Sequence, residues 1–293
     1  MDFNKLNSHL KQLDVDYLYH IGIDTTMDLS IFNDLEYIVF VTTDSDALLF
    51  ASMFAKDNNI YQFKGYPIFK TERYHLYKVG PVLAISYGIG APSLLICLNE
   101  VAKLVYHINK PNIKFLKIGR ADGIGDIDIG ALSLVDRALD SKLDPVFYSL
   151  ECGVKYSYPT TLDNSLLNDI QQFGKLINYK LVTGSAIGSF SDYEEQACMD
   201  GFLPLVITAQ DRDLFLTKAI EHNVKTLSTD VTAFASFCNE LTISACALDV
   251  VIVKRTNTDV LPLVLDLDKQ YIAMSNACSL VSKYIAHKLH LAK

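Results

Sequence analysis

Short apolar runs of strand length alternate with segments of helical periodicity along this chain of 293 residues. The run Tyr37–Val41 (YIVFV) is apolar throughout, as in a strand buried on both faces. The next segment, Ser45–Ala55, spaces its apolar residues as a helix does. This alternation predicts an α/β fold with helices on both faces of a sheet. The same patterns predict strands at 74–78, 82–87, 113–118, 131–135 and 250–253, helices at 94–107, 211–222, 230–238 and 269–289, an amphipathic segment at 162–175, and an ambiguous segment at 203–208.

The composition favours one domain over residues 1–293, because there is no internal repeat, low-complexity segment or compositional shift. Half of the residues are hydrophobic and 20% are charged, so the chain can bury a large core. The net charge of -8 argues against nucleic acid as a partner. The apolar runs are too short to cross a bilayer, and no basic, apolar leader begins the chain. We therefore expect a soluble, cytoplasmic protein without a membrane partner.

The cysteines and histidines show no metal-binding spacing. The six cysteines are scattered without a Cys-x-x-Cys pair, so we expect buried, reduced thiols rather than disulfides or a zinc site. His287 and His290 share a face near the end of the last predicted helix, where a positive charge is favourable. No third ligand is placed near them, so the sequence predicts no metal site. The cysteines are Cys97, Cys152, Cys198, Cys238, Cys246 and Cys278.

The stretch Lys117–Gly125 (KIGRADGIG) directly follows the apolar run at 113–116. Closely spaced glycines after a strand let a ligand approach the backbone, and strand ends are where α/β sheets bind small molecules. Arg120 and Asp122 are nevertheless bulky charges for such a turn. The glycine spacing fits neither a P-loop nor a dinucleotide-binding turn. A second glycine pair, in Gly88–Gly90, is better explained as a tight turn into a helix than as a phosphate site.

Six segments together resemble uridine phosphorylases. They occur in the same order and cover nearly the whole chain, which makes the resemblance specific although each segment alone is weak. It implies the nucleoside phosphorylase fold: one α/β domain with a twisted mixed β-sheet, flanked by helices and assembling as dimers or trimers of dimers. The segments are 18–20 (LYH), 73–82 (RYHLYKVGPV), 86–93 (SYGIGAPS), 118–125 (IGRADGIG), 193–201 (YEEQACMDG) and 253–256 (VKRT).

The resemblance implies the reaction of uridine with phosphate to give uracil and ribose 1-phosphate, in pyrimidine nucleoside salvage. Phosphate is the co-substrate, and no metal or organic cofactor is needed. Cations must hold the phosphate dianion, and a carboxylate must position the sugar as it becomes oxocarbenium-like. Donors must meet the negative charge that develops on the departing uracil.

Four positions match the family's ribose and phosphate residues or keep their charge. His20 matches a histidine that reaches the ribose 5′-hydroxyl across the dimer interface, and Arg73 an arginine lent to the neighbour's phosphate. Asp230 stands for the ribose-binding glutamate, one methylene shorter. Lys117 stands for a phosphate-binding arginine and lacks its bidentate fork.

The base site is matched in part. Gln196 matches the glutamine that reads the uracil edge, and Arg255 matches a second base contact. Together with Asp230, these two form the implied catalytic set. Ile252 and Val253 match the apolar wall of the base site.

Two base-site positions depart from the family. Cys198 replaces the arginine that pairs with Gln196 on uracil. Asp192 falls where the family has the phenylalanine that packs on the nucleoside, a role that Phe190 fills if the loop shifts by two residues.

The phosphate side departs more sharply. Thr42 replaces a glycine, Asp46 an arginine and Arg120 a small threonine, while Ser228 and Thr229 replace a glutamate and a methionine beside the ribose. Because a cation is lost at position 46 and gained at position 120, we expect Asp46 and Arg120 to form an ion pair that fills the phosphate subsite.

Two functional classes follow from these matches and departures. One is a uridine phosphorylase with weak or altered activity. The other is a non-catalytic protein that binds a nucleoside or nucleobase, as a homodimer or as the heterodimer partner of an active paralogue.

Overall fold

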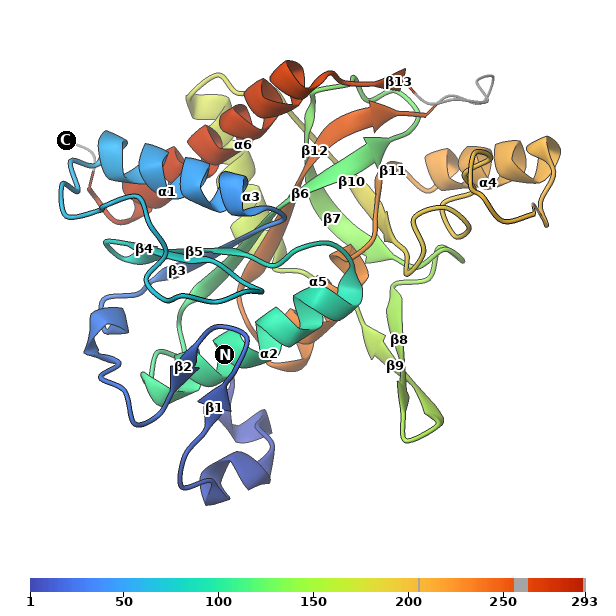
Figure 1. Ribbon diagram of the computed structural model, residues 1–293. Helices are drawn as coiled ribbons and strands as arrows, with labels where there is room; N and C mark the ends of the chain where they lie inside the picture. The colour runs from blue at the N-terminus through green and yellow to red at the C-terminus, as the bar shows by residue number, and fades with distance from the viewer. Residues whose placement is uncertain (205, 256–262, 292–293) are drawn as a thin grey trace.

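A twisted mixed sheet forms the centre of the protein in the computed structural model, which describes residues 1–204, 206–255 and 263–291 (Figure 1). Among these residues the largest sheet has nine strands, in the order β13-β12-β7-β10-β11-β6-β3-β5-β4. The strands are β1 Tyr17–Leu18, β2 Ile23–Asp24, β3 Tyr37–Val41, β4 Leu76–Val79, β5 Val82–Ser86, β6 Lys114–Gly123, β7 Leu132–Leu139, β8 Val146–Glu151, β9 Val154–Pro159, β10 Leu181–Gly188, β11 Val224–Ser228, β12 Ala245–Lys254 and β13 Leu263–Val264. The α-helices are α1 Asp44–Asp57, α2 Ala91–His107, α3 Asn164–Leu176, α4 Ala209–Glu221, α5 Val231–Glu240 and α6 Leu267–Lys288, and 3-10 turns lie at Phe3–Lys5, Ser8–Gln12 and Ser30–Phe32.

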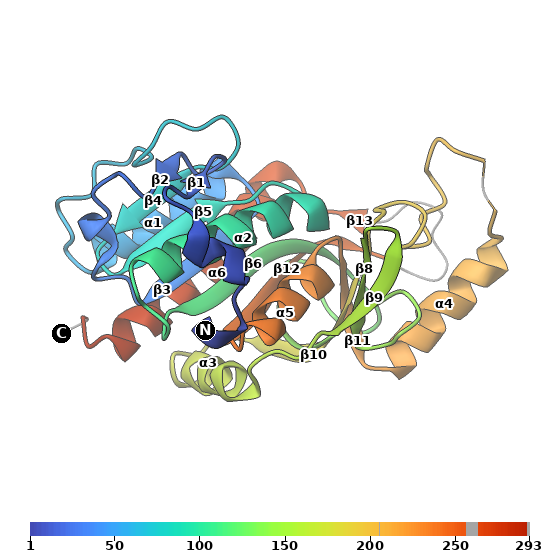
Figure 2. The same ribbon diagram turned by 90° about the horizontal axis from the view of Figure 1, so that it is seen from below.

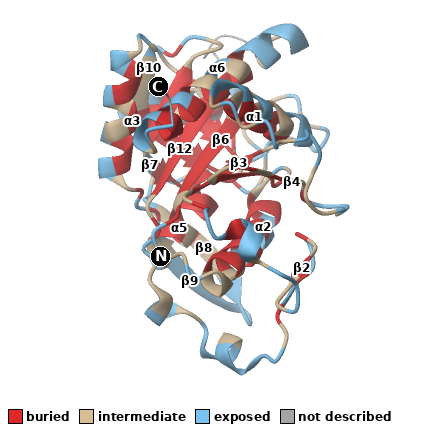
Figure 3. Cartoon of the chain, turned by 90° about the vertical axis from the view of Figure 1, so that its left-hand side faces the viewer, coloured by how far each residue is buried: buried red, intermediate tan, exposed pale blue. Residues whose placement is uncertain are grey.

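The side-chain alternation of the central strands builds a core on each face of the sheet (Figures 2 and 3). In β3, Tyr37, Val39 and Val41 pack with α1, α3 and α6. The two residues between them, Ile38 and Phe40, point to the opposite face and pack with α2 and α5. A strand buried on both faces has no polar side, which explains its unbroken apolar sequence. The predicted arrangement of helices on both faces is therefore confirmed.

The predicted elements with strong apolar patterns are present. The strand at 37–41 and the helices near 45–55, 94–107, 162–175, 211–222, 230–238 and 269–289 are confirmed to within a few residues. The ambiguous segment at 203–208 forms neither helix nor strand at its described positions, and Leu205 lies outside them. Thr256, the last residue of one family-like segment, also lies outside the described residues.

The sequence did not predict the two-residue strands β1, β2 and β13, nor the longer strands β8, β9, β10 and β11. The hairpin of β8 and β9 is mostly exposed and therefore lacks an apolar pattern (Figure 1). In β10, glycine and small residues interrupt the run LVTGSAIG. These strands form because neighbouring strands pair with them, β10 in parallel with both β7 and β11.

The predicted turn at Lys117–Gly125 is wrong for most of its length. Strand β6 continues to Gly123, because β12 pairs with it in parallel up to the register partners Lys254 and Gly123. The chain turns only at Gly125, whose φ of +68° suits glycine. By contrast, the turn expected at Gly88–Gly90 is confirmed: both glycines have φ of +84°, and Gly90 caps α2.

Gly188 ends β10 against the first turn of α5, and a Cβ there would lie 2.7 Å from the backbone nitrogen of Thr232. We predict that Gly188→Ala lowers the free energy of unfolding by about 1–3 kcal/mol, because α5 must shift away from the sheet. Urea unfolding followed by circular dichroism measures this change. The control is Gly201→Ala, whose Cβ would meet only ordinary contacts of 3.4 Å or more. Equal stability of the two variants would contradict the prediction.

Candidate functional site

The ends of β3 and β5, the outer part of β6 and the start of α5 bring several of the predicted site residues together. Thr42 follows β3, and its carbonyl accepts a hydrogen bond from the Gly88 nitrogen, 3.0 Å away, so the ends of β3 and β5 are tied together. Lys117 and Arg120 lie on β6, which pairs with β3 on one side and with β12 on the other. In α/β sheets such strand ends are the usual place for a ligand.

A buried ion pair joins Lys117 and Asp230. The Lys117 Nζ lies 2.8 Å from Asp230 Oδ1 and 3.8 Å from the carboxylate of Asp249, and the Lys117 side chain is fully buried. Tyr87 donates its hydroxyl to the other Asp230 oxygen at 2.7 Å. Asp230 is the N-cap residue of α5 but makes no capping hydrogen bond, because its carboxylate is committed to Lys117 and Tyr87.

Burial and charge act in opposite directions on this group. Burial lowers the pKa of Lys117, but the neighbouring Asp230, Tyr87 and Asp249 outweigh it and raise that pKa above its ordinary value. Burial raises the pKa of Asp249, and Lys117 opposes the shift. The ammonium of Lys117 is therefore a permanent cation at neutral pH, fixed by internal carboxylates.

Gly119 provides the space for this ammonium. A Cβ at Gly119 would lie 2.5 Å from Lys117 Nζ. The sequence suggested that the glycines of this stretch admit a ligand to the backbone. At Gly119 the structure shows instead that the close approach is made by the chain's own lysine.

The predicted ion pair between Asp46 and Arg120 is confirmed. Arg120 Nη2 donates to Asp46 Oδ1 at 2.9 Å, and Nη1 donates to the second oxygen, so the contact is bidentate. Thr43, the N-cap residue of α1, also donates its hydroxyl to Asp46 Oδ2 at 2.7 Å. The Asp46 carboxylate lies in the first turn of α1, where the helix dipole favours a negative charge.

A third ion pair joins Asp122 to Arg255, one of the predicted base-site residues. Arg255 Nε donates to Asp122 Oδ2 at 2.5 Å, its Nη1 donates to the Gln196 carbonyl at 2.8 Å, and its Nη2 lies 2.7 Å from Cys198 Sγ. Burial raises the pKa of Asp122, with Arg255 opposing the shift. The sequence singled out Asp122 only as an oddly placed charge. The register of β6 against β12, which places Asp122 opposite Val253, explains its contact with Arg255.

The remaining residues predicted for the base site lie in the segment 190–198. Gln196 is buried and donates its amide to the Ser189 hydroxyl at 2.9 Å. Cys198 donates to the backbone oxygen of Asp192 at 3.2 Å, while the Asp192 residue itself is exposed. Phe190 is 57% exposed and packs on Phe147 of β8, with ring centroids 5.5 Å apart.

The other predicted positions lie near these groups. Thr229 accepts a hydrogen bond from the Ala91 nitrogen at 3.0 Å, and the Ser228 carbonyl accepts one from the Ser189 nitrogen at 2.9 Å. The β12 register shifts between Val251 and Val253, and Ile252 packs against the core that α1, α3 and α6 cover.

His20 and Arg73 are placed on the α2 side of the protein. Arg73 Nη2 donates to the Ser93 hydroxyl at 2.9 Å, and His20 Nδ1 lies 2.6 Å from Glu100 Oε1. Both residues are exposed. Among the described residues neither makes a direct hydrogen bond or ion pair with Asp230 or Gln196. The Ser93 hydroxyl that Arg73 contacts, however, donates to the carbonyl of Tyr87, which binds Asp230.

The cysteine prediction holds in part. All six thiols are free, but Cys152 is exposed and Cys198 is half-buried, because they lie at the β8–β9 turn and beside Arg255. Within the described ranges, no group of three or more His, Cys, Asp or Glu residues is arranged to hold a metal ion. Over the same residues, no helix is long and apolar enough to span a membrane.

No protein-family model matches the chain, but comparison with individual proteins finds similar ones. Mouse uridine phosphorylase 1 is 29% identical over 259 residues, covering 86% of this chain and 83% of the relative. A uridine phosphorylase of Schistosoma mansoni, solved in complex with uracil, superposes with a TM-score of 0.90 at 26% identity, covering 97% of this chain and 99% of that one. The chain is thus similar to uridine phosphorylases over most of its length, in sequence and in fold, and a divergent member of that family fits. This similarity confirms the resemblance and the predicted fold class.

A further relative bears on activity. The protein of Schistosoma mansoni named inactive uridine phosphorylase B is 28% identical over 258 residues, covering 87% of this chain and 86% of the relative. A protein named inactive thus occurs among the members to which this chain is similar.

The buried pair at Lys117 generates a stability prediction. We expect Lys117→Met to lower the free energy of unfolding by about 3–5 kcal/mol at pH 7, because it leaves the Asp230 and Asp249 carboxylates buried without a cation. Chemical unfolding measures the change. Lys180→Met is the matched control, because the Lys180–Asp128 pair is exposed on both sides and its loss leaves stability unchanged. A fully stable Lys117→Met variant would show that the pair is dispensable.

Proposed function

We propose that this protein binds pyrimidine nucleosides or nucleobases in the uridine phosphorylase manner, with phosphorolysis weak or lost. The observation that carries the proposal is the bidentate contact between Arg120 and Asp46. By family resemblance these two positions belong to the phosphate subsite, so a carboxylate of the chain takes the place of the incoming phosphate.

The charges around this subsite argue against binding a phosphate dianion. The Arg120 guanidinium is neutralised by Asp46, and the Lys117 ammonium by Asp230. Breaking a buried pair of this kind costs about 3–5 kcal/mol, and each 1.4 kcal/mol is roughly a tenfold change in affinity. Phosphate would also meet the repulsion of the displaced Asp46. Together these effects weaken phosphate binding by at least about 100-fold relative to a subsite of free arginines.

The ribose and base sides keep more of the family's groups. Asp230 is fixed by Lys117 and Tyr87, as a carboxylate that grips sugar hydroxyls must be. Gln196 and Arg255, which the resemblance assigns to the base site, are both present and contact each other. The similar Schistosoma mansoni protein was solved in complex with uracil, which supports the same ligand class for this chain. The proposal needs no metal or organic cofactor.

The proposed assembly is a dimer, formed with a second copy or with an active paralogue. His20 and Arg73 are exposed and make no direct contact with Asp230 or Gln196, which fits residues that serve a neighbouring subunit. In such a heterodimer this chain would supply residues to a competent site while its own phosphate subsite stays closed. The proposed setting is pyrimidine nucleoside salvage in the cytoplasm, where residual activity would be that of a glycosyltransferase.

The first test combines binding and turnover. We expect uridine to bind with a dissociation constant that inorganic phosphate leaves unchanged, because Asp46 already occupies the proposed phosphate subsite. Isothermal titration with and without phosphate measures this, and chromatography measures the uracil released. Rapid, phosphate-dependent release of uracil would contradict the closed subsite, and absence of binding to uridine, thymidine and uracil would contradict the ligand class.

The second test opens the phosphate subsite. We predict that Asp46→Ala binds inorganic phosphate at least about tenfold more tightly than the unmodified protein, because it frees Arg120 and removes the repelling carboxylate. Phosphate should also raise the melting temperature of this variant and leave that of the unmodified protein unchanged. The control is Asp44→Ala, which removes the same charge from the same helix turn but whose carboxylate accepts from Tyr77. Equal phosphate affinity of the two variants would contradict the assigned role of Asp46.

A further inference from the structure

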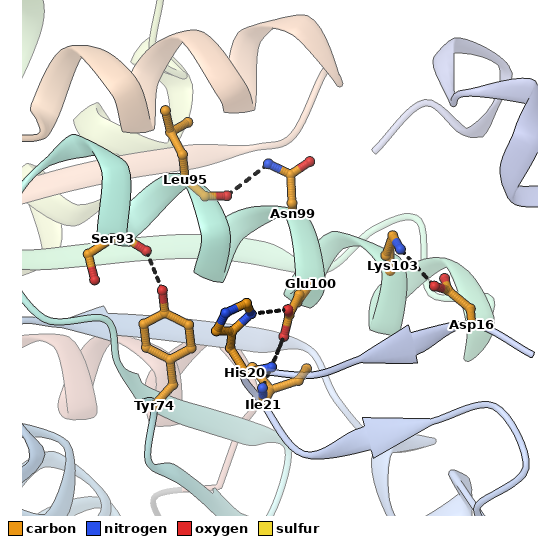
Figure 4. Close-up of polar contacts among 9 residues, drawn as sticks. All are labelled: Asp16, His20, Ile21, Tyr74, Ser93, Leu95, Asn99, Glu100 and Lys103. Carbon is orange, nitrogen blue, oxygen red and sulfur yellow. Dashed lines mark hydrogen bonds and ion pairs between the residues drawn. The ribbon is translucent and has the colours of Figure 1, made fainter. Parts of the chain in front are cut away.

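One face of helix α2 holds the N-terminal segment, residues 16–21, by charged contacts (Figure 4). Lys103 Nζ lies 2.7 Å from Asp16 Oδ1, and His107 Nε2 lies 2.9 Å from the other Asp16 oxygen. One turn earlier on the same face, Glu100 contacts the segment at His20 and Ile21. Residues 100, 103 and 107 follow the helical spacing that puts side chains on one face. The segment is therefore held at two points.

Glu100 makes three hydrogen bonds with this segment. Its Oε2 accepts from the backbone nitrogens of His20 and Ile21, at 2.9 and 3.0 Å, and its Oε1 lies 2.6 Å from His20 Nδ1. The Glu100 side chain is 11% exposed, whereas the His20 side chain is 45% exposed. One buried carboxylate thus fixes both the backbone and the ring of a histidine whose other edge faces outward.

This contact determines which nitrogen of His20 carries the proton. A carboxylate at Nδ1 favours the tautomer with hydrogen on Nδ1. In the neutral ring, Nε2 is then a lone-pair acceptor. Tyr74 lies beside the ring, with centroids 6.1 Å apart, and its own hydroxyl is bound to the Ser93 carbonyl at 2.7 Å. The imidazole is therefore oriented by a fixed neighbour as well as by Glu100.

We propose that Glu100 is a positioning residue that holds His20 with Nε2 as the acceptor for a hydroxyl of a nucleoside bound in the neighbouring subunit. This role rests on the proposed function, in which His20 serves the neighbour's ribose site. Glu100 itself touches no ligand. It acts by fixing the tautomer and direction of His20.

The test uses Glu100→Gln in the full chain, which keeps the size of the side chain and removes its charge. We expect uridine to bind about tenfold more weakly to this variant, at the lower end of the effect of losing an orienting partner. In a His20→Ala background the same substitution should have no further effect, because Glu100 acts only through His20. Nitrogen NMR of the histidines should show Nδ1–H for His20 in the unmodified protein and a larger Nε2–H population in the variant. The control is Asn99→Ala, the adjacent α2 residue, whose amide donates to the Leu95 carbonyl.

The possible outcomes separate this role from the proposed function. If the unmodified protein fails to bind uridine, thymidine and uracil, both the ligand class and the role of Glu100 fall. If it binds uridine but Glu100→Gln has unchanged affinity, or has an equal effect with and without His20, only the role of Glu100 falls. An Nε2–H tautomer of His20 in the unmodified protein would overturn the role without any variant.

Discussion

The ion pair between Lys117 and Asp230 is the interaction on which the rest of the site depends. Lys117 lies on the strand that joins the two halves of the sheet, with β3 on one side and β12 on the other, and Asp230 begins α5. A fully buried ammonium is unfavourable unless carboxylates surround it, so the chain must bring β6, β12 and the start of α5 together. Gly119 must then remain without a side chain, because Lys117 Nζ lies over it. The ligand corner of the sheet is therefore built around a charge that the protein itself supplies.

Two more ion pairs between side chains of the protein join neighbouring elements in the same way. Asp46 and Arg120 link α1 to β6, and Asp122 and Arg255 link β6 to the end of β12. All three pairs include a residue of β6, and each includes a position that the resemblance assigns to the sugar, phosphate or base site. The positive charges of Lys117, Arg120 and Arg255 are therefore paired with carboxylates of the chain itself. The pair at Asp46 bears most directly on the proposed function, in which these two positions belong to the phosphate subsite.

Much of the fold was predictable from sequence where a segment is buried on both faces or amphipathic. The run Tyr37–Val41 is a strand with the predicted bounds because every position faces a core. The segment Lys117–Gly125 was misinterpreted because its glycines are typical of turns, whereas pairing with β12 keeps it extended to Gly123. Strands such as β10 and β11 carry weak local patterns and exist because neighbours complete their hydrogen bonds. The spacing of apolar residues indicates which positions are buried. It does not indicate which distant strand forms backbone hydrogen bonds with a segment.

The family-like order of segments, the residue types at the site and the exchange of charge between positions 46 and 120 can all be read from the sequence. Family order predicted that these two loops converge, and opposite charges predicted that they pair. The packing of the elements established that Asp122 neutralises Arg255 and that Glu100 holds His20, and it placed the Lys117 ammonium over Gly119. The first two pairs are separated by about 80 residues or more, whereas Lys117 and Gly119 lie two residues apart on β6. Such contacts depend on how elements pack, since a charged residue specifies what kind of partner it needs but not which one the fold brings within reach.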